Sequence, residues 1–325
     1  MRKKLRNLQM WLTYAAVRAG LTLLRLLPFG PAEALCVGVG RLIFHLDGRH
    51  REISLANLRL AFPEKDDAWR WRVARGSFEN YGRMALEVAN LPLWTPGNIR
   101  DYVTFENYAY YEKAKKKGRG CFYMTAHFGN WELAGQVQPL FGHVGHIVVR
   151  PLDNPYLDAY LARMRTSNGS SIIDKKHGGV KAMIGALRRN EDIAILVDQY
   201  SRRSKGVLVP FFGVLASTTA GVAVMALRTR TPILPCFTIR EPGKMRFRAI
   251  LLPEIELPDT GSKKEDIRLT TARINEALEQ AIRMRPDHWL WGHRRWKKST
   301  DIAGNLYNGG KVIRRHGKPV PEEAA

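Results

Sequence analysis

The spacing of hydrophobic and polar positions predicts alternating helices and buried strands over most of the chain. Between residues 66 and 90 the apolar side chains recur every three or four positions, which is the spacing of an amphipathic helix. Four short apolar runs then have the length of buried strands: residues 120–126, 144–149, 193–197 and 233–239. Helical stretches separate these runs, so the pattern predicts an α/β fold with a mostly parallel sheet flanked by helices.

Local signals place the helices around these strands. Asn154 is suited to cap a helix that has Pro155 in its first turn and ends near Gly169. Further helical patterns cover residues 179–189 and 263–285, and the second of these stops before a proline.

The uncharged segment 206–227 resembles a membrane span in length only. Pro210 and Gly213 interrupt it, and a run of hydroxyl residues follows at 217–219. These breaks predict a strand over 207–212, a turn, and a helix whose N-terminus is capped by a serine or threonine. We therefore expect buried α/β core here.

The N-terminal segment, residues 10–27, is apolar but carries Arg18 and Arg25. Its longest uncharged run, residues 7–17, is shorter than the roughly 20 apolar residues that a spanning helix needs. On a helix, its basic side chains share one face while the leucines lie largely on another. This pattern predicts a helix lying in the bilayer interface; the alternative is an amphipathic helix packed on its own domain.

Charge narrows the class of partner. The 325 residues include 52 lysines and arginines against 30 acidic residues, a net charge of +22, which favours nucleic acid, an anionic membrane or an acidic carrier as partner. The first 30 residues hold six basic residues and no acidic one, as expected beside the cytoplasmic face of an anionic bilayer. Cys36, Cys121 and Cys236 are far apart and are predicted to be reduced core residues.

Ionisable residues follow three of the predicted strands: His127 and Glu132 the first, Arg150 the second and Asp198 the third. The functional crevice of an open α/β sheet lies beyond these strand ends. With His127 in the turn and Glu132 one helical turn further, the carboxylate can accept a hydrogen bond from one imidazole nitrogen. The other nitrogen then stays free as a general base. The alternative is a capping glutamate beside a half-buried histidine.

Two of these residues have further interpretations. Arg150 suits a developing oxyanion or a substrate phosphate; the alternative is an ion pair with Asp198 or Asp153. Asp198 is either a carboxylate that supports the catalytic group or a structural acid.

Short motifs recur along residues 5–300: NL at 57–58, AFP at 61–63, HFGNWE at 127–132, RPLDNP at 150–155, DQ at 198–199, VPFFG at 209–213 and PDHWLWGHRRWK at 286–297. In this order and spacing they resemble the bacterial lipid A biosynthesis lauroyl/myristoyl acyltransferases. No single motif is specific to this family, but the whole set in this order and spacing is.

The resemblance implies acyl transfer from an acyl carrier protein thioester to a hydroxyl of a lipid A precursor, at the cytoplasmic face of the inner membrane. His127 would deprotonate the hydroxyl, and Glu132 would orient and stabilise the imidazolium, with no acyl-enzyme. The chemistry needs no cofactor or metal, and the chain has no phosphate-binding glycine motif. The residues assigned to substrate binding are Asn130, Arg150, Asp198, Arg294 and Arg295.

Tryptophans alternate with basic residues in the last motif, where Arg294 and Arg295 lie. Three interpretations stay open: a surface that stacks nucleobases, a membrane-interface belt beside lipid phosphates, or a tryptophan-rich edge of the core with a solvated charge run. The resemblance favours the second.

The chain is predicted to divide into a membrane-associating helical segment (residues 1–45), an α/β acyltransferase domain (46–305) and a disordered basic tail (306–325). The expected partners are acyl carrier protein, a phosphate-bearing acceptor lipid and the anionic membrane, and no nucleic acid. Phosphatidylinositol mannosides, ornithine lipids and glycerol lipids are the alternative acceptors. A basic nucleic-acid-binding protein is the remaining rival, but it leaves the pairing of His127 with Glu132 unexplained.

Overall fold

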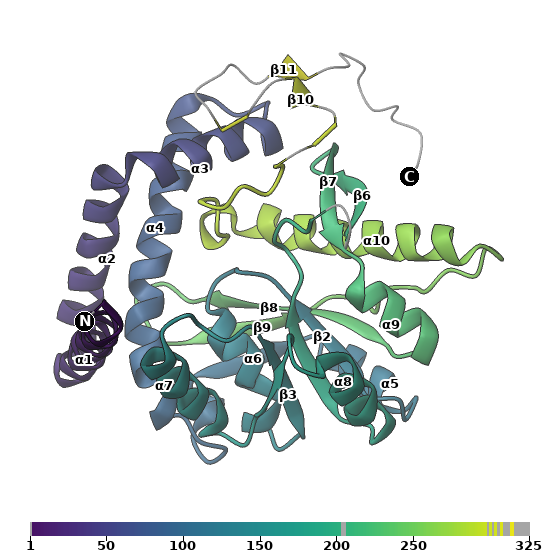
Figure 1. Cartoon of the computed structure of the whole chain (residues 1–325), viewed down its shortest axis with the longest axis horizontal. Coiled ribbons are helices and arrows are strands. Elements are labelled where there is room, and N and C mark those ends of the chain that lie inside the picture. The colour runs from purple at the N-terminus through teal and green to yellow at the C-terminus, as the bar shows by residue number, and fades with distance from the viewer. Residues whose placement is uncertain are drawn as a thin grey trace.

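A seven-stranded sheet forms the centre of the computed structural model, which describes residues 2–202, 206–297, 299–300, 302–303, 306–307 and 313–314. The strand order is β1-β9-β8-β2-β5-β3-β4 (Figure 1). Only the β8–β9 pair is antiparallel in this sheet, so the predicted α/β class with a mostly parallel sheet is confirmed. The strands are β1 (Val103–Glu106), β2 (Cys121–Thr125), β3 (Gly145–Val149), β4 (Ser171–Asp174), β5 (Asp192–Leu196), β8 (Ile233–Arg240) and β9 (Phe247–Leu251).

The four predicted strands are β2, β3, β5 and β8. They are consecutive in the sheet, and none of them is an edge strand. Sequence patterning missed β1, β4 and β9, because these outer strands are short or mix polar with apolar residues. All three cysteines are buried and unpaired, as predicted.

Helices flank the sheet, and the helical patterns reappear at nearly the predicted boundaries. Asn154 caps α7 by accepting from the backbone N–H groups of Tyr156 and Leu157. The helices after the N-terminal pair are α3 (Gly48–Ala61), α4 (Asp67–Asn90), α5 (Ala109–Lys115), α6 (Trp131–Leu140), α7 (Pro155–Thr166), α8 (Gly179–Arg188), α9 (Gly221–Thr229) and α10 (Lys263–Met284).

A hairpin outside the main sheet corrects one prediction. β6 (Gly206–Phe211) pairs with β7 (Val214–Thr219), so the hydroxyl residues at 217–219 lie in a strand and cap no helix. Helix α9 begins after Ala220 without a side-chain cap. The reason is that Val214, Ala216 and Thr218 alternate inward and bury in the core, which favours a strand over an earlier helix start. The expectation that segment 206–227 is α/β core is confirmed.

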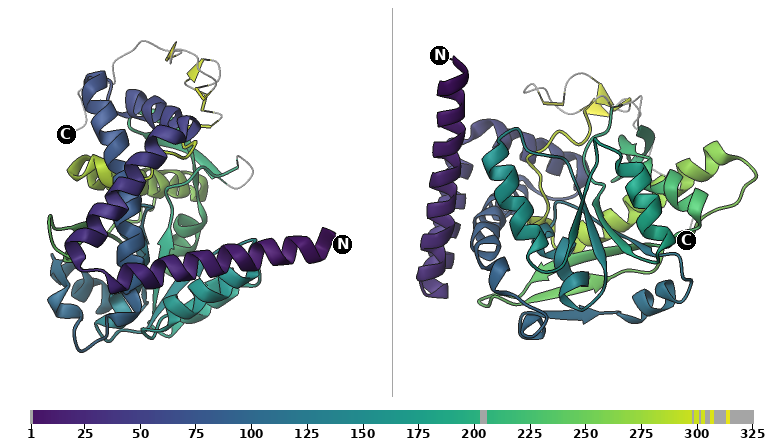
Figure 2. Two further views of the ribbon diagram at one scale, coloured as in Figure 1. Left: turned by 90° about the vertical axis from the view of Figure 1, so that its left-hand side faces the viewer. Right: turned by 60° about the horizontal axis from the view of Figure 1, so that its bottom comes forward.

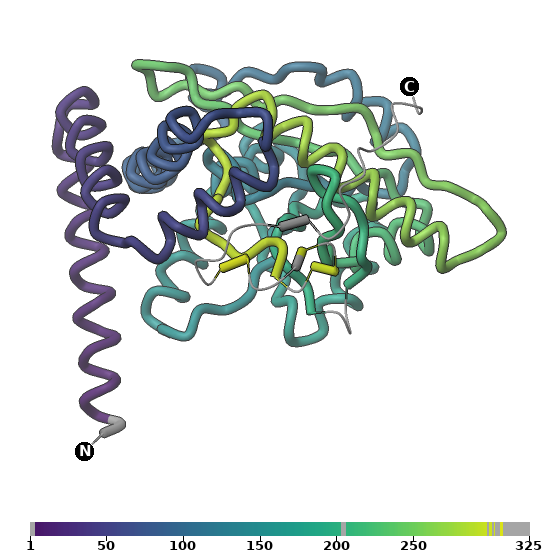
Figure 3. Tube along the Cα trace, turned by 90° about the horizontal axis from the view of Figure 1, so that it is seen from above, coloured from purple at the N-terminus to yellow at the C-terminus, as the bar shows by residue number. Residues whose placement is uncertain are grey.

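Two helices at the N-terminus stand beside the rest of the molecule. Helix α1 (Arg2–Leu26) lies along α7, to which Asn154 Nδ2 ties it by donating to the Met10 carbonyl (2.9 Å), and its first turns project away from the body (Figures 2 and 3). Of the leucines expected on the apolar face, Leu12, Leu23 and Leu27 are exposed, whereas Leu24 is half-buried against α2 and α4. The exposed leucine face of α1 consists of Leu5, Leu8, Leu12, Leu23 and Leu26.

Helix α2 (Phe29–Leu46) packs on α4 and is the more apolar of the pair. Among the described helices it is the one whose length and composition suit a membrane crossing, with a mean hydropathy of 1.2 and 28% of its residues buried. The predicted membrane-associating segment, residues 1–45, covers both α1 and nearly all of α2. The outward row of α2 consists of Leu35, Val39, Leu42, Ile43 and Leu46. The predicted tail, 306–325, lies almost entirely outside the described residues.

Candidate active site

His127 and Asp198 meet because their strands are neighbours. β2 and β5 pair in parallel up to Thr125 and Leu196, so the residues just beyond both strand ends lie side by side. His127 Nδ1 is 2.9 Å from Asp198 Oδ1, and the His127 backbone N–H donates to Oδ2 at 3.0 Å. The indole N–H of Trp289 also donates to Oδ2, at 2.9 Å. Asp198 is completely buried, and these donors compensate its charge.

The electrostatics of this pair fix the protonation of the imidazole. Although burial raises the pKa of Asp198, the charge of His127 and its hydrogen bond lower that pKa below the ordinary value, so the carboxylate is ionised. An ionised carboxylate only accepts hydrogen bonds; Nδ1 therefore carries a proton, and Nε2 of the neutral ring has a free lone pair. Burial lowers the pKa of His127, but Asp198 and, further off, Glu132 outweigh it and leave the pKa above 6.5.

Glu132 does not make the hydrogen bond predicted for it. Its carboxylate accepts two bonds from the guanidinium of Arg165 on α7, at 2.6 and 2.7 Å. The bidentate geometry matches a planar guanidinium, and the imidazole already has its carboxylate in Asp198. The orienting partner of His127 is thus Asp198, and Glu132 acts on the imidazole only through its charge.

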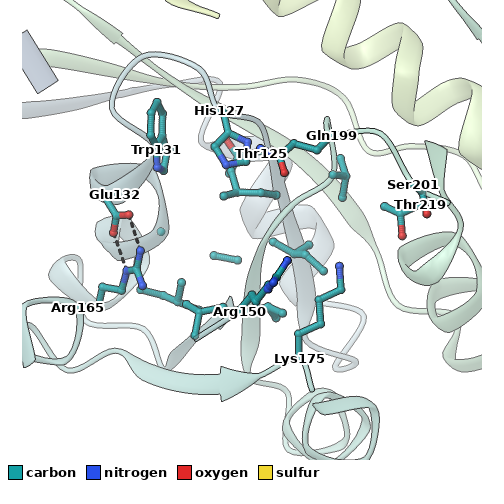
Figure 4. A pocket seen from close by; sticks show the side chains of 18 of the residues that line it. Thr125, His127, Trp131, Glu132, Arg150, Arg165, Lys175, Gln199, Ser201 and Thr219 are labelled. Atoms are coloured by element: carbon teal, nitrogen blue, oxygen red, sulfur yellow. Dashed lines mark hydrogen bonds and ion pairs between the residues drawn. The ribbon is translucent and has the colours of Figure 1, made fainter. Parts of the chain in front are cut away.

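A cavity of about 460 Å³ opens in front of His127. Figure 4 shows His127 on one side of this cavity, with Arg150 and Lys175 opposite and the Glu132–Arg165 pair on the wall between. The imidazole is 19% exposed, toward this space. The polar side chains of the lining are Thr125, Glu132, Arg150, Arg165, Lys175, Gln199, Tyr200, Ser201 and Thr219.

The apolar part of the cavity arises where two strands separate. β3 and β5 pair only from Gly145 to Ile147, although β3 continues to Val149 and β5 to Leu196. Each strand stays paired with its other neighbour, so the sheet opens between them beyond the Ile147–Ala194 pair. We call this opening the strand slot. It is lined by Gly135, Ile147, Val148, Val149, Leu152, Ala194, Ile195, Leu196 and Val197.

Gly135 lies over the closed end of the strand slot. A β-carbon there would meet the side chain of Ile147 at 3.5 Å, an ordinary van der Waals contact. Ile147 belongs to the last paired position of β3 and β5. Gly135 and Ile147 together therefore bound the depth of the slot.

Arg150 reaches the cavity as predicted. It is exposed and forms no ion pair with a described acidic residue, so the alternative pairing with Asp198 or Asp153 is absent within that part of the chain. Lys175, Gln199 and Tyr200 were missed. The first follows β4, whose strand pattern was not recognised; the others directly follow Asp198, so their position after a predicted strand was the available signal.

Asn130 and Arg295 do not line the cavity. Asn130 is 1% exposed and caps α6 by accepting from the backbone N–H of Leu133. Arg295 is completely buried, donating to the Ser217 carbonyl and to Thr218 Oγ1 and lying over the ring of Phe211. Both side chains were predicted to bind substrate, but the structure places them in the interior, with internal hydrogen-bond partners. Asp198, the third buried residue of the predicted set, does not line the cavity either; it hydrogen-bonds to His127.

The tryptophan motif belongs to the core. Trp289, Trp291 and Trp296 are at most 1% exposed, so the membrane-belt and nucleobase-stacking interpretations are wrong for these rings. Arg294 is partly buried over the Tyr307 ring. Buried Asn57 connects the first motif to the last by donating to the backbone carbonyls of residues 291 and 293, at 2.7 and 2.8 Å. The motif therefore holds the helical region that precedes β1 against the rest of the domain and supports Asp198 through Trp289.

The fold and this site define a class: an α/β protein with a histidine, held by a buried carboxylate, in front of an apolar slot. Residues 1–298 match the model of the bacterial lipid A biosynthesis acyltransferase family. Since that match spans almost the whole chain, the protein belongs to this family and is an acyltransferase.

The relatives share nearly their full length with this chain. A lipid A biosynthesis lauroyltransferase of Escherichia coli is 29% identical over 91% of this chain and 95% of its own. A palmitoleoyltransferase from the same organism is 26% identical, with 91% and 94% covered. A myristoyltransferase of E. coli is 22% identical, with 86% and 84% covered. These relatives are named for different acyl chains, so the family match alone leaves the chain length open.

Proposed function

We propose that this protein transfers a fatty acyl chain from an acyl carrier protein thioester to a hydroxyl of a lipid A precursor. The observation that carries the proposal is His127, with Nδ1 committed to buried Asp198 and its second nitrogen available at the cavity that contains the strand slot. Lipid A is the favoured acceptor because the relatives are all named for lipid A biosynthesis.

In the proposed reaction, Nε2 of His127 takes the proton of the acceptor hydroxyl as its oxygen attacks the thioester carbonyl. The tetrahedral intermediate collapses by breaking the carbon–sulfur bond, and the leaving thiolate receives the proton from the imidazolium. The products are the acyl ester and the carrier thiol. No side chain is acylated, and Asp198 stabilises the imidazolium throughout.

The proposed reaction involves two negatively charged groups, a phosphate of the substrate and the oxyanion that develops at the thioester carbonyl. Cationic side chains around the cavity can bind both. Arg150 and Lys175 lie opposite His127 (Figure 4), where either can bind a substrate phosphate or the developing oxyanion. Glu132 is proposed to hold Arg165 at the cavity wall and to favour the imidazolium by its charge. Arg294 is the remaining predicted phosphate ligand, and it is not among the residues that line this cavity.

The N-terminal helices are proposed to attach the enzyme to the inner membrane, with the α/β domain in the cytoplasm. The exposed leucine face of α1 and the outward row of α2 are apolar surfaces without a protein partner among the described residues. Such faces bury in the acyl region of a bilayer, and the exposed basic side chains Lys4, Arg6 and Arg18 would lie at the level of lipid phosphates. Residues 1–45 would thus anchor the catalytic part, residues 46–305.

Mass spectrometry of lipid A from cells with and without the gene tests the function. We expect the deletion to remove one acyl group, whose mass gives the chain length, and plasmid-borne wild-type protein to restore it. Unchanged lipid A together with an altered ornithine, glycerol or mannoside lipid would instead identify one of the alternative acceptors.

The strand slot predicts how acyl chain length is selected. Gly135→Leu should shorten the slot and shift preference from palmitoyl toward lauroyl donors, whereas Ile147→Ala should lengthen it and shift preference the opposite way. Because one methylene group in a hydrophobic pocket changes selectivity by about tenfold or more, we expect at least that change in the ratio of kcat/KM values. Competition between the two donors in one assay measures this ratio.

Ile172→Ala is the matched control, since Ile172 lies beside Ile147 in register on β4 but outside the cavity. It should leave the ratio unchanged. If Gly135→Leu and Ile147→Ala alter the ratio in the same direction, or no more than the control, the acyl chain lies elsewhere.

A further inference from the structure

A basic surface adjoins the cavity on the side away from the N-terminal helices. It consists of four exposed side chains, Lys175, Lys176, Lys181 and Arg188, which we call the α8 basic face. No acidic residue occurs between its first and last members in the sequence. None of the four forms an ion pair with an acidic residue that the structure describes. The positive charge of this face is therefore available to a partner.

This face is continuous with the reaction site. Lys175 belongs both to the face and to the cavity lining (Figure 4), and it directly follows β4. Lys181 and Arg188 lie two turns apart on the same side of α8. Val180 is 59% exposed beside them and offers an apolar contact within the charged surface. A partner bound here would be next to the cavity mouth.

Helix α1, which is proposed above to meet the membrane, lies on the opposite side of the cavity. Figures 1 and 2 show α7 and α8 on opposite sides of β3, with α1 along α7. An acceptor anchored in the bilayer approaches from α1 and α7, so the α8 side is left for a soluble donor. This arrangement separates the two substrates in space and lets both reach His127.

We propose that the α8 basic face is the docking surface for the acidic acyl carrier protein, and that Lys175 guides the phosphate of its prosthetic arm into the cavity. The proposal rests on the proposed function, since it names the surface by which the donor reaches that site. Complementary charge at such a rim speeds association and fixes orientation, while the reaction itself depends on other residues.

Charge reversal of Lys176 and Lys181 tests this docking surface, because both lie outside the cavity lining. For Lys176→Glu/Lys181→Glu we expect KM for lauroyl-acyl carrier protein to rise about tenfold with little change in kcat. The same variant should use lauroyl-coenzyme A, which has the arm but no protein, with unaltered kinetics. Direct titration of the carrier protein should show the same loss of affinity.

Lys263→Glu/Lys264→Glu is the matched control, with the same change in net charge at two exposed lysines at the start of α10. It should leave KM for the carrier-linked donor within about twofold of wild type, since these lysines do not border the cavity. An equal rise in KM for both variants would reveal net-charge attraction and overturn the docking surface.

Two further results separate the possible failures. If Lys176→Glu/Lys181→Glu impairs both donors equally, or impairs binding to anionic phospholipid vesicles while sparing the carrier, the face binds something other than the carrier and the proposal is wrong. If the wild-type protein transfers no acyl group from either donor, the proposed function fails, and carrier titration still decides whether the face binds acyl carrier protein.

Discussion

His127→Ala is expected to abolish acyl transfer, lowering kcat by about 10²-fold to 10⁴-fold or more. The methyl side chain cannot take the proton of the acceptor hydroxyl, and no other described imidazole lines the cavity. Asp198 keeps two hydrogen-bond donors, the backbone N–H of residue 127 and the indole of Trp289, so the protein should still fold. Transfer of a radiolabelled acyl group to the lipid acceptor measures the loss.

His127→Asn separates the loss of the base from a folding defect, because the asparagine amide can donate a hydrogen bond to Asp198 but cannot act as a base. It should be as inactive as the alanine variant while its thermal unfolding stays close to wild type. The matched control is His50→Ala, which removes a histidine whose Nδ1 lies 2.6 Å from a carboxylate, Asp47, in a pair that does not line the cavity. Wild-type turnover by either His127 variant would exclude this residue as the base.

Asp198→Asn should also lower kcat by about 10²-fold to 10⁴-fold, for a different reason. An amide at this position can donate to Nδ1 and so place the imidazole proton on Nε2, the nitrogen that must accept from the acceptor hydroxyl. The imidazolium also loses the charge that stabilises it during transfer. The ratio of residual activity to folded protein, taken from a thermal melt, separates this effect from destabilisation.

The pH profile tests the same pair. A general base works in its neutral form, so kcat/KM of the wild type should rise with pH and be half-maximal above pH 6.5, because Asp198 and Glu132 raise the pKa of His127 despite burial. Without the charge of Asp198, burial dominates, and the half-maximal point of Asp198→Asn should move to lower pH. Asp47→Asn, at the surface pair with His50, should leave the profile unchanged. An unshifted profile in Asp198→Asn would refute the pairing.

The strand ends show how far a sequence can locate a site. Placing His127 and Asp198 after apolar runs put both at one edge of the sheet, since parallel strands end together. Choosing Glu132 as the partner relied on distance along the chain, and this favoured a residue one helical turn away. The register of β2 with β5 brings Asp198 closer, although it lies 71 positions away.

The buried arginine and tryptophans of the last motif show what local sequence does not reveal about a site. Arg295 and the neighbouring tryptophans have the composition of a surface that binds phosphates, yet all are buried. Local sequence does not distinguish the two cases, because Thr218 and the Ser217 carbonyl, which compensate the guanidinium, come from a distant hairpin.

The sequence by itself determined the α/β class, the central strands, most helices, the family and the position of His127 at a strand end, because these depend on periodicity and on short motifs. Only the tertiary structure decided which carboxylate holds His127, which arginines are buried, which side of α2 stays uncovered, and where the strand slot opens. These features depend on strand register and on contacts between residues far apart in the chain, and neither is encoded in the local spacing of hydrophobic and polar positions.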